Sequence, residues 1–116
     1  MAVSTQFNAF VLDLLGAQLP VTARRMFGGV GYYASGLFFA IADDDVLYFR
    51  ADAASRGYFE AEGMQPFAPL GPGSKSMNYY TLPARVYDDT EELMLWLQRA
   101  LAAARNAGGK RRTRRS

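Results

Sequence analysis

Apolar residues near the N-terminus repeat with the spacing of one face of an α-helix. The stripe consists of Phe7, Phe10, Val11, Leu14 and Leu15. Ser4 or Thr5 can cap the first turn, because short oxygen-bearing side chains accept hydrogen bonds from free N–H groups. We expect this helix to end at Leu19, since the residue before a proline avoids helical backbone angles.

Short apolar segments typical of β-strands follow this helix. Strands are predicted over residues 25–33, 37–42 and 46–50. Three glycines, Gly28, Gly29 and Gly31, interrupt the first strand and indicate a β-bulge or a close approach of two backbones. The turns at 34–36 and 43–45 are short, so we expect the three strands to form an antiparallel meander.

A short second helix is predicted next, with Asp52 as its cap. Ala54, Tyr58 and Phe59 are expected to face inward, and Gly63 is expected to end the helix. These assignments depend on very few residues, and Gly57 lowers the helix propensity by about 1 kcal/mol relative to alanine.

The last third of the chain predicts two strands and a long helix. Residues 64–70 are interpreted as an edge strand because they contain proline, and residues 77–82 as a second strand. Asp89 can cap the last helix, which Gly108-Gly109 is expected to end. Its apolar stripe is Leu93, Trp96, Leu97, Ala100, Leu101 and Ala104.

These elements predict an α+β domain with a mainly antiparallel sheet and the order α-β-β-β-α-β-β-α. At 116 residues, the chain has the length of one domain. We expect that domain to cover residues 1–107 and a disordered basic tail to cover residues 108–116.

The composition narrows the chemistry that this domain can perform. Half of the residues are hydrophobic, but the chain contains no cysteine and no histidine. Disulfides, thiolate metal sites and histidine-based catalysis are therefore excluded, and we expect no cofactor, no metal site and no enzymatic activity. The run Asp43-Asp44-Asp45 is attributed to turn chemistry. No apolar run approaches about 20 residues, so we expect a cytoplasmic protein without a membrane span.

Positive charge is concentrated at the C-terminus. Five basic residues fall within the last seven: Lys110, Arg111, Arg112, Arg114 and Arg115. The other 109 residues carry eight basic and eleven acidic groups. The basic segment therefore predicts non-specific contact with nucleic-acid phosphates, although a merely solubilising tail is the open alternative.

Two further segments are candidate binding sites. The backbone around Arg25, Met26, Phe27, Gly28 and Gly29 could present N–H groups to an anion or a partner. The alternative that we favour is a structural role, because a phosphate loop would lead into a helix rather than a strand.

Lys75, Tyr79 and Tyr80 form the second candidate. A lysine in a glycine-rich loop beside aromatic residues could bind an anionic or planar ligand. The alternative is that one tyrosine is part of the core, its neighbour faces the other way and Lys75 is solvated.

Several separated motifs share one resemblance. They are Arg25-Met26-Phe27-Gly28-Gly29 with Gly31, Phe39-Ala40 with Asp43, Leu47-Tyr48, Asp52 with Phe59 and Gly63, Pro66-Phe67, and Met77-Asn78-Tyr79-Tyr80 with Pro83. In this order they resemble the N-terminal domain of the TfoX/Sxy family, regulators associated with bacterial DNA-transformation competence. The resemblance implies an α+β domain similar to secretion-chaperone-like folds, which often dimerise, here expected to stand alone without the C-terminal domain of those regulators.

The resemblance also implies a regulatory role. We expect a non-enzymatic regulatory or adaptor domain that contacts an unknown protein partner through a sheet edge or an aromatic face, and we expect the domain to form a homodimer. Two other functions remain open: nucleic-acid association through the basic tail, and sensing of a small anionic ligand between the glycine segment and the Lys75 loop.

Overall fold

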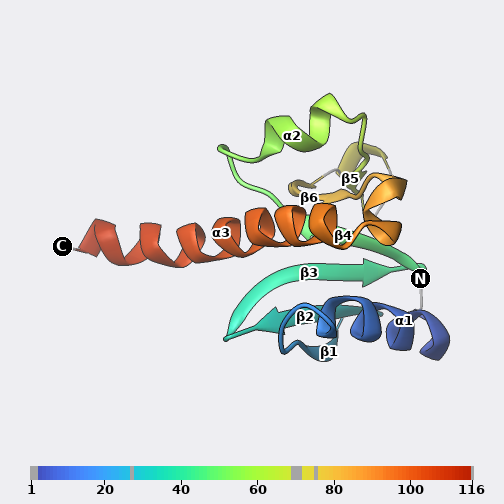
Figure 1. Cartoon of the computed structure of the whole chain (residues 1–116). Helices are drawn as coiled ribbons and strands as arrows, with labels where there is room; N and C mark the ends of the chain where they lie inside the picture. The colour runs from blue at the N-terminus through green and yellow to red at the C-terminus, as the bar shows by residue number, and fades with distance from the viewer. Residues whose placement is uncertain (1–2, 27, 69–71, 75, 116) are drawn as a thin grey trace.

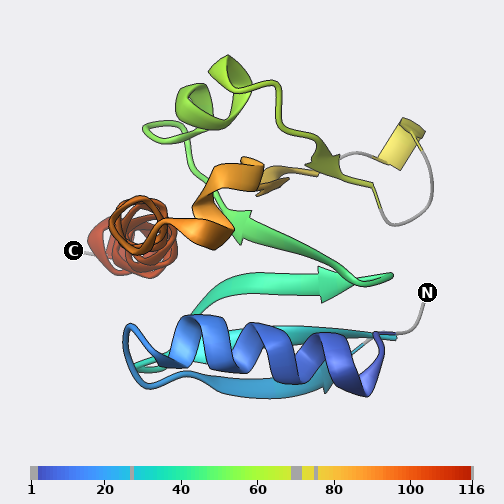
Figure 2. The ribbon, with the colours of Figure 1, turned by 45° about the vertical axis from the view of Figure 1, so that its right-hand side comes forward.

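The computed structural model describes residues 3–26, 28–68, 72–74 and 76–115. It has an antiparallel six-stranded sheet in the order β1-β2-β3-β4-β6-β5, with helices packed on one face (Figures 1 and 2). The predicted α+β class with a mainly antiparallel sheet is confirmed.

Helix α1 covers Thr5–Gly16, and Ser4 caps it as predicted. The Ser4 hydroxyl oxygen accepts a hydrogen bond of 3.0 Å from the backbone N–H of Phe7. Val11 and Leu15 are buried, so this part of the predicted stripe is confirmed. Phe10, which was expected on the same buried face, is 45% exposed instead.

Four strands form a meander: β1 (Thr22–Met26), β2 (Gly29–Ala34), β3 (Leu37–Asp43) and β4 (Val46–Arg50). The prediction of one interrupted strand over 25–33 is wrong, because β1 and β2 pair with each other through Met26 and Gly29. The chain therefore reverses direction between Met26 and Gly29, where Gly28 has a φ of 81°. Glycine adopts this left-handed conformation without the steric penalty that a Cβ atom imposes.

The two other turns of the meander are as predicted. Ser35 and Gly36 have φ values of 51° and 77°, and Asp44 and Asp45 have values of 53° and 58°. Two consecutive residues with positive φ give a turn that matches the natural twist of paired strands. A bulge does occur in this sheet, but it lies in β3, where Phe39 is the extra residue between the partners of Tyr32 and Tyr33.

The next segment contains α2 (Arg56–Ala61), β5 (Pro66–Phe67), the short 3-10 helix η1 (Pro72–Ser74) and β6 (Ser76–Thr81). Ser55, rather than Asp52, is the residue before α2; the Asp52 carboxylate accepts from the Ser55 N–H at 2.9 Å and so fixes the preceding turn. Phe59 is fully buried as predicted, whereas Ala54 and Tyr58 face outward, contrary to expectation. A helix of six residues is too short for its apolar spacing to define an inner face.

A second 3-10 helix, η2 (Ala84–Asp88), leads into α3 (Thr90–Arg115). The carboxylate of Asp89 accepts from the N–H groups of Glu91 and Glu92, which confirms the predicted cap. The predicted stop at Gly108-Gly109 is wrong, since α3 is continuous through both glycines and extends past the sheet (Figure 1). Each glycine costs about 1 kcal/mol, but the alanine, lysine and arginine residues around them are good helix formers.

The helices α1, α2 and α3 pack on the same side of the sheet. The Tyr32 hydroxyl donates to the side-chain oxygen of Asn8 in α1 at 2.7 Å, and the Phe59 ring of α2 stacks on Tyr80 at 5.3 Å. Trp96 of α3 meets the Phe59 ring edge-on at 4.9 Å. Among the residues that the structure describes, no helix covers the opposite face of the sheet.

The two edges of the sheet are unlike each other. Edge strand β1 has five residues, of which Arg24 and Arg25 are exposed. The sequence predicted a proline-broken edge strand over residues 64–70. In the described part of that range, edge strand β5 has only two residues, one of them Pro66.

Among the helices described, none combines the length and the apolar character that a membrane span needs.

Candidate functional site

The uncovered face of the sheet carries a row of half-buried apolar side chains. We call it the aromatic sheet face; it comprises Tyr33, Phe38, Ile41, Tyr48, Phe67 and Tyr79. The rings of Tyr33 and Phe38 stack with centroids 5.0 Å apart, and Phe38 lies 6.0 Å from Tyr79. Tyr48 and Phe67 pack at 5.0 Å. Alternation along the strands, together with the bulge at Phe39 in β3, brings these side chains from distant parts of the sequence onto one surface.

Two arginines flank these rings. The Arg24 guanidinium carbon lies 6.0 Å from the centroid of Tyr33, and that of Arg50 lies 5.8 Å from Tyr79. Arg50 also donates to the Phe38 carbonyl at 3.2 Å. Neither guanidinium pairs with an acidic side chain of the described part of the chain. The aromatic sheet face therefore combines apolar area with two positive charges that remain available to an external group.

The glycines predicted as an anion site are accounted for by packing. A Cβ atom on Gly29 would lie 2.5 Å from the Ala42 carbonyl oxygen, and one on Gly31 would lie 2.7 Å from the Met26 methyl group and 2.9 Å from the Phe38 ring. The space beside both glycines is thus filled by neighbouring strands and side chains. This geometry favours the structural interpretation of the segment, and anion binding by its amides stays a prediction.

The other members of that predicted site are dispersed. Met26 lies half-buried beside the aromatic sheet face, while Arg25 is exposed and alternates to the helix side of β1. Gly28 is exposed in the turn. Phe27 lies outside the described residues.

Tyr79 and Tyr80 point to opposite sides of the sheet. Tyr79 belongs to the aromatic sheet face, whereas Tyr80 is 1% exposed and donates its hydroxyl hydrogen to Glu60 at 3.1 Å. Burial raises the pKa of both tyrosines, and the Glu60 contact adds to the rise for Tyr80. The two rings therefore do not line one site. Lys75, the third predicted member, lies outside the described residues.

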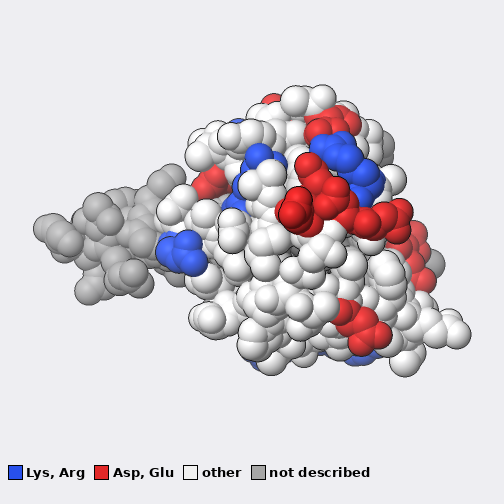
Figure 3. All heavy atoms as spheres, viewed as in Figure 1, with Lys and Arg blue, Asp and Glu red and all other residues white. Residues whose placement is uncertain are grey.

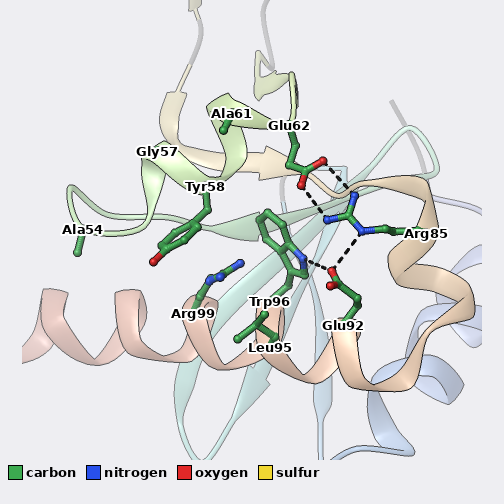
Figure 4. A pocket seen from close by; sticks show the side chains of 10 residues that line it. All are labelled: Ala54, Gly57, Tyr58, Ala61, Glu62, Arg85, Glu92, Leu95, Trp96 and Arg99. Atoms are coloured by element: carbon green, nitrogen blue, oxygen red, sulfur yellow. Dashed lines mark hydrogen bonds and ion pairs between the residues drawn. The ribbon is translucent and has the colours of Figure 1, made fainter.

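A pocket that the sequence did not indicate lies between α2 and α3. It has a volume of about 490 Å³, and Figure 4 shows the side chains around it. The Arg99 guanidinium lies over Tyr58, with its carbon 3.7 Å from the ring centroid, and 4.7 Å from the centroid of Trp96. Tyr58 and Leu95 are 52% and 45% exposed. We call this the α2/α3 pocket.

One end of the α2/α3 pocket is closed by an ion-pair cluster. Arg85 donates to both Glu62 oxygens, at 3.0 and 2.7 Å, and its Nε lies 3.4 Å from Glu92. Hydrogen bonding from Arg85 holds the pKa of the Glu62 carboxyl below its usual value, and the same contact raises the pKa of Arg85. The Trp96 indole N–H donates to Glu92 at 3.1 Å. These contacts fix Trp96 and Arg85, and they occupy the donors of Arg85 with acidic partners.

Among the residues coloured in Figure 3, charge does not gather into one sign. Their basic and acidic groups lie next to each other, so these residues form no broad positive footprint for nucleic acid on that face. The side chains of Lys110, Arg111, Arg112, Arg114 and Arg115 lie outside those described, so their phosphate contact stays a prediction. In the described part of the chain, no group of three acidic side chains is arranged to hold a metal ion.

The fold and these surfaces define a small α+β domain whose helices cover one face of an antiparallel sheet. The chain belongs to the TfoX N-terminal domain family, which matches residues 13–104 and so confirms the resemblance of the motifs. No curated relative matches the chain. Family membership supports a regulatory domain, and it specifies no partner.

Proposed function

We propose that this chain is a non-catalytic regulatory or adaptor domain that acts by protein–protein contact, with the aromatic sheet face as its contact surface. The observation that carries the proposal is the row of half-buried rings from Tyr33 to Tyr79 that no helix of the described part covers. Aromatic residues and arginine are the types that are enriched at protein interfaces and dominate their binding energy.

The partner is expected to be a protein with an apolar patch and acidic groups at its rim. Rings of the aromatic sheet face supply the apolar centre, and Arg24 and Arg50 supply positive charge beside it. Charge complementarity of this kind selects partners and accelerates their association. A second copy of the chain is the competing occupant, because Asp43 lies at the opposite end of the same face from Arg50.

The amino-acid composition supports a function without catalysis. The chain has no histidine or cysteine, which are the commonest bases, nucleophiles and metal ligands of enzymes. Family membership agrees with a regulatory role. A purified chain that accelerates turnover of a metabolite would overturn this part of the proposal.

The contact surface can be tested with two matched pairs of variants. Ile41→Lys places a charge on the central strand of the aromatic sheet face, and Phe10→Lys makes the same change on the exposed side of α1. Arg24→Glu reverses a charge of the face, and Arg105→Glu reverses one on α3, whose Arg105 is exposed. Partners captured from the native cell are identified, purified and titrated against each variant.

We expect Ile41→Lys and Arg24→Glu each to weaken the binding of a purified partner by at least tenfold, which corresponds to about 1.4 kcal/mol of binding free energy. Phe10→Lys and Arg105→Glu are expected to change the affinity little. Equal binding by all four variants would overturn the proposed surface. Light scattering measures the oligomeric state independently. If the chain is a dimer and Ile41→Lys dissociates it, the aromatic sheet face binds a second copy of the chain, and the proposal of a different partner protein is wrong.

A further inference from the structure

The α2/α3 pocket lies on the helix side of the sheet, so it is separate from the surface proposed above. We infer that this pocket binds the carboxylate of an apolar monoanion, with Arg99 as the anion-binding group. The inference does not depend on the proposed contact function, and either can fail without the other.

The position of Arg99 is the first argument. Its guanidinium lies between two rings, 3.7 Å from the Tyr58 centroid and 4.7 Å from that of Trp96. Stacking on aromatic faces holds the guanidinium while its N–H groups remain able to form hydrogen bonds. Two parallel N–H groups of an arginine match the two oxygens of a carboxylate. Arg99 is therefore held in place without its donors being used by the rings.

The contrast with Arg85 is the second argument. Arg85 is paired with Glu62 and Glu92, whereas no ion pair joins Arg99 to any acidic side chain that the structure describes. The α2/α3 pocket thus contains one arginine that is paired with acidic side chains and one that is not, and Figure 4 shows them on opposite sides of Trp96. An external carboxylate would supply the acidic partner that Arg99 lacks.

The neighbouring charges limit the ligand to a single negative charge. Two arginines and two glutamates line the pocket, so its formal charge is zero; one anion can pair with Arg99 and brings the pocket to −1. A second negative charge would face Glu62 and Glu92, and like charges at short distance repel. Phosphate dianions and nucleotides are therefore poorly suited to this site.

The walls determine the rest of the ligand. Leu95 and Tyr58 are large, apolar in most of their surface and substantially exposed at the pocket. Ala54 and Ala61 leave space beside them. A volume of about 490 Å³ lies within the usual range for small-molecule sites, and it admits a phenyl-sized group next to the carboxylate. Such a group can belong to a free small acid or to the last residue of a peptide.

Trp96 supplies the measurement, because it is the chain's single tryptophan and part of this pocket. The probe is 3-phenylpropionate, titrated while tryptophan emission and the indole N–H resonance are recorded. 3-Phenylpropanol provides the uncharged control, and phenyl phosphate provides the dianion. N-Acetyl-alanyl-phenylalanine and its C-terminal amide distinguish a peptide end from a free acid.

We expect 3-phenylpropionate to give a saturable change with a Kd of millimolar order, about −4 kcal/mol. The alcohol, the phosphate and the peptide amide are expected to bind at least tenfold more weakly. Arg99→Gln should weaken the binding of 3-phenylpropionate by at least tenfold. Arg105→Gln removes the same charge outside the pocket and should leave that affinity unchanged. Tighter binding of the peptide acid than of the small acid would identify a protein C-terminus as the source.

Two results would overturn the inference. One is equal binding of the alcohol and the acid, which would show that Arg99 recognises no charge. The other is a response that fails to saturate up to about 10 mM, or that survives Arg99→Gln with unchanged affinity. Circular dichroism of each variant establishes that it is folded before it is titrated.

Discussion

Gly29 in β2 packs so closely on Ala42 in β3 that a Cβ atom on the glycine would lie 2.5 Å from the Ala42 carbonyl oxygen. The obstacle is backbone in a neighbouring strand, so it cannot rotate away as a side chain would. Gly57 in α2 is the opposite case, because nothing lies within 4 Å of the position its Cβ would take.

These two glycines therefore predict opposite effects of the same substitution. Gly29→Ala is expected to reduce the free energy of unfolding by about 1–3 kcal/mol, since the strands must separate to admit the methyl group. Gly57→Ala is expected to increase it by about 0.4–1 kcal/mol, because alanine restricts the unfolded chain and favours helix. Urea unfolding of the three proteins measures both changes, and equal changes of the same sign would contradict the packing described for Gly29.

The Asp89 cap predicts a measurable loss of helix stability. Its carboxylate accepts from the N–H groups of Glu91 and Glu92, both at 3.1 Å, so Asp89→Ala leaves two donors at the start of α3 without this acceptor. The expected destabilisation is about 0.5–2 kcal/mol. Asp88→Ala is the matched control, because Asp88 is an exposed neighbour of the same charge at the end of η2. If Asp88→Ala is as unstable as Asp89→Ala, the destabilisation is caused by the change in net charge rather than by loss of the cap.

Buried tyrosines predict unfolding in alkali. Burial raises the pKa of Tyr32 to about 12, although Arg25 partly opposes the rise, and a tyrosine in an unfolded chain ionises near 10. The unfolded state therefore loses its proton first. The stability contributed by Tyr32 is fully present below about pH 10 and is lost as the pH rises through about 12.

Urea unfolding between about pH 8 and pH 11 measures this dependence. Tyr32→Phe is expected to flatten the decline, even though it also removes the hydrogen bond to Asn8. Tyr58→Phe serves as the control, since Tyr58 is 52% exposed. If Tyr32→Phe leaves the fall in stability with pH unchanged, other groups cause that fall. Tyr48 and Tyr87 are candidates, because burial also raises their pKa values.

The basic C-terminal segment predicts salt-dependent binding to nucleic acid. Deletion of residues 110–116 removes five positive charges, so binding to duplex DNA at low salt should be abolished. For the whole chain, the logarithm of the affinity should fall with the logarithm of salt concentration by about 0.9 per phosphate neutralised. Binding that survives the deletion would exclude this segment as the nucleic-acid site.

Local rules account for the parts of the fold that the sequence predicted well. Ser4 and Asp89 cap their helices, and Ser35-Gly36 and Asp44-Asp45 form their turns, because each depends on residues only a few positions apart. The same locality explains an error. Glycine permits both a bulge and a tight turn, so the sequence around Gly28 could not distinguish one bent strand from the hairpin of β1 and β2.

The two surfaces proposed here as binding sites were predicted only in part, because tertiary packing creates them. The sequence indicated Tyr79 as a candidate binding residue. It did not indicate Tyr33 and Phe38, the neighbouring rings of the aromatic sheet face, because they come from β2 and β3. Tyr58 and Arg99 meet across 41 positions of the chain, and the error of placing Tyr58 inside removed it from consideration. A signal was present: Arg99 follows Trp96 by three residues, and such residues share one side of a helix.

The unlike sheet edges have a consequence for behaviour at high concentration. Edge-to-edge addition of a second molecule through β1 would bring four arginine side chains together. Strand β5 has only two residues, one of them a proline, which is too little to template a strand. Growth into fibrils by this route is therefore disfavoured at both edges of the sheet. Concentrated salt, by screening the arginines of β1, removes the protection at that end and leaves β5 as the remaining barrier.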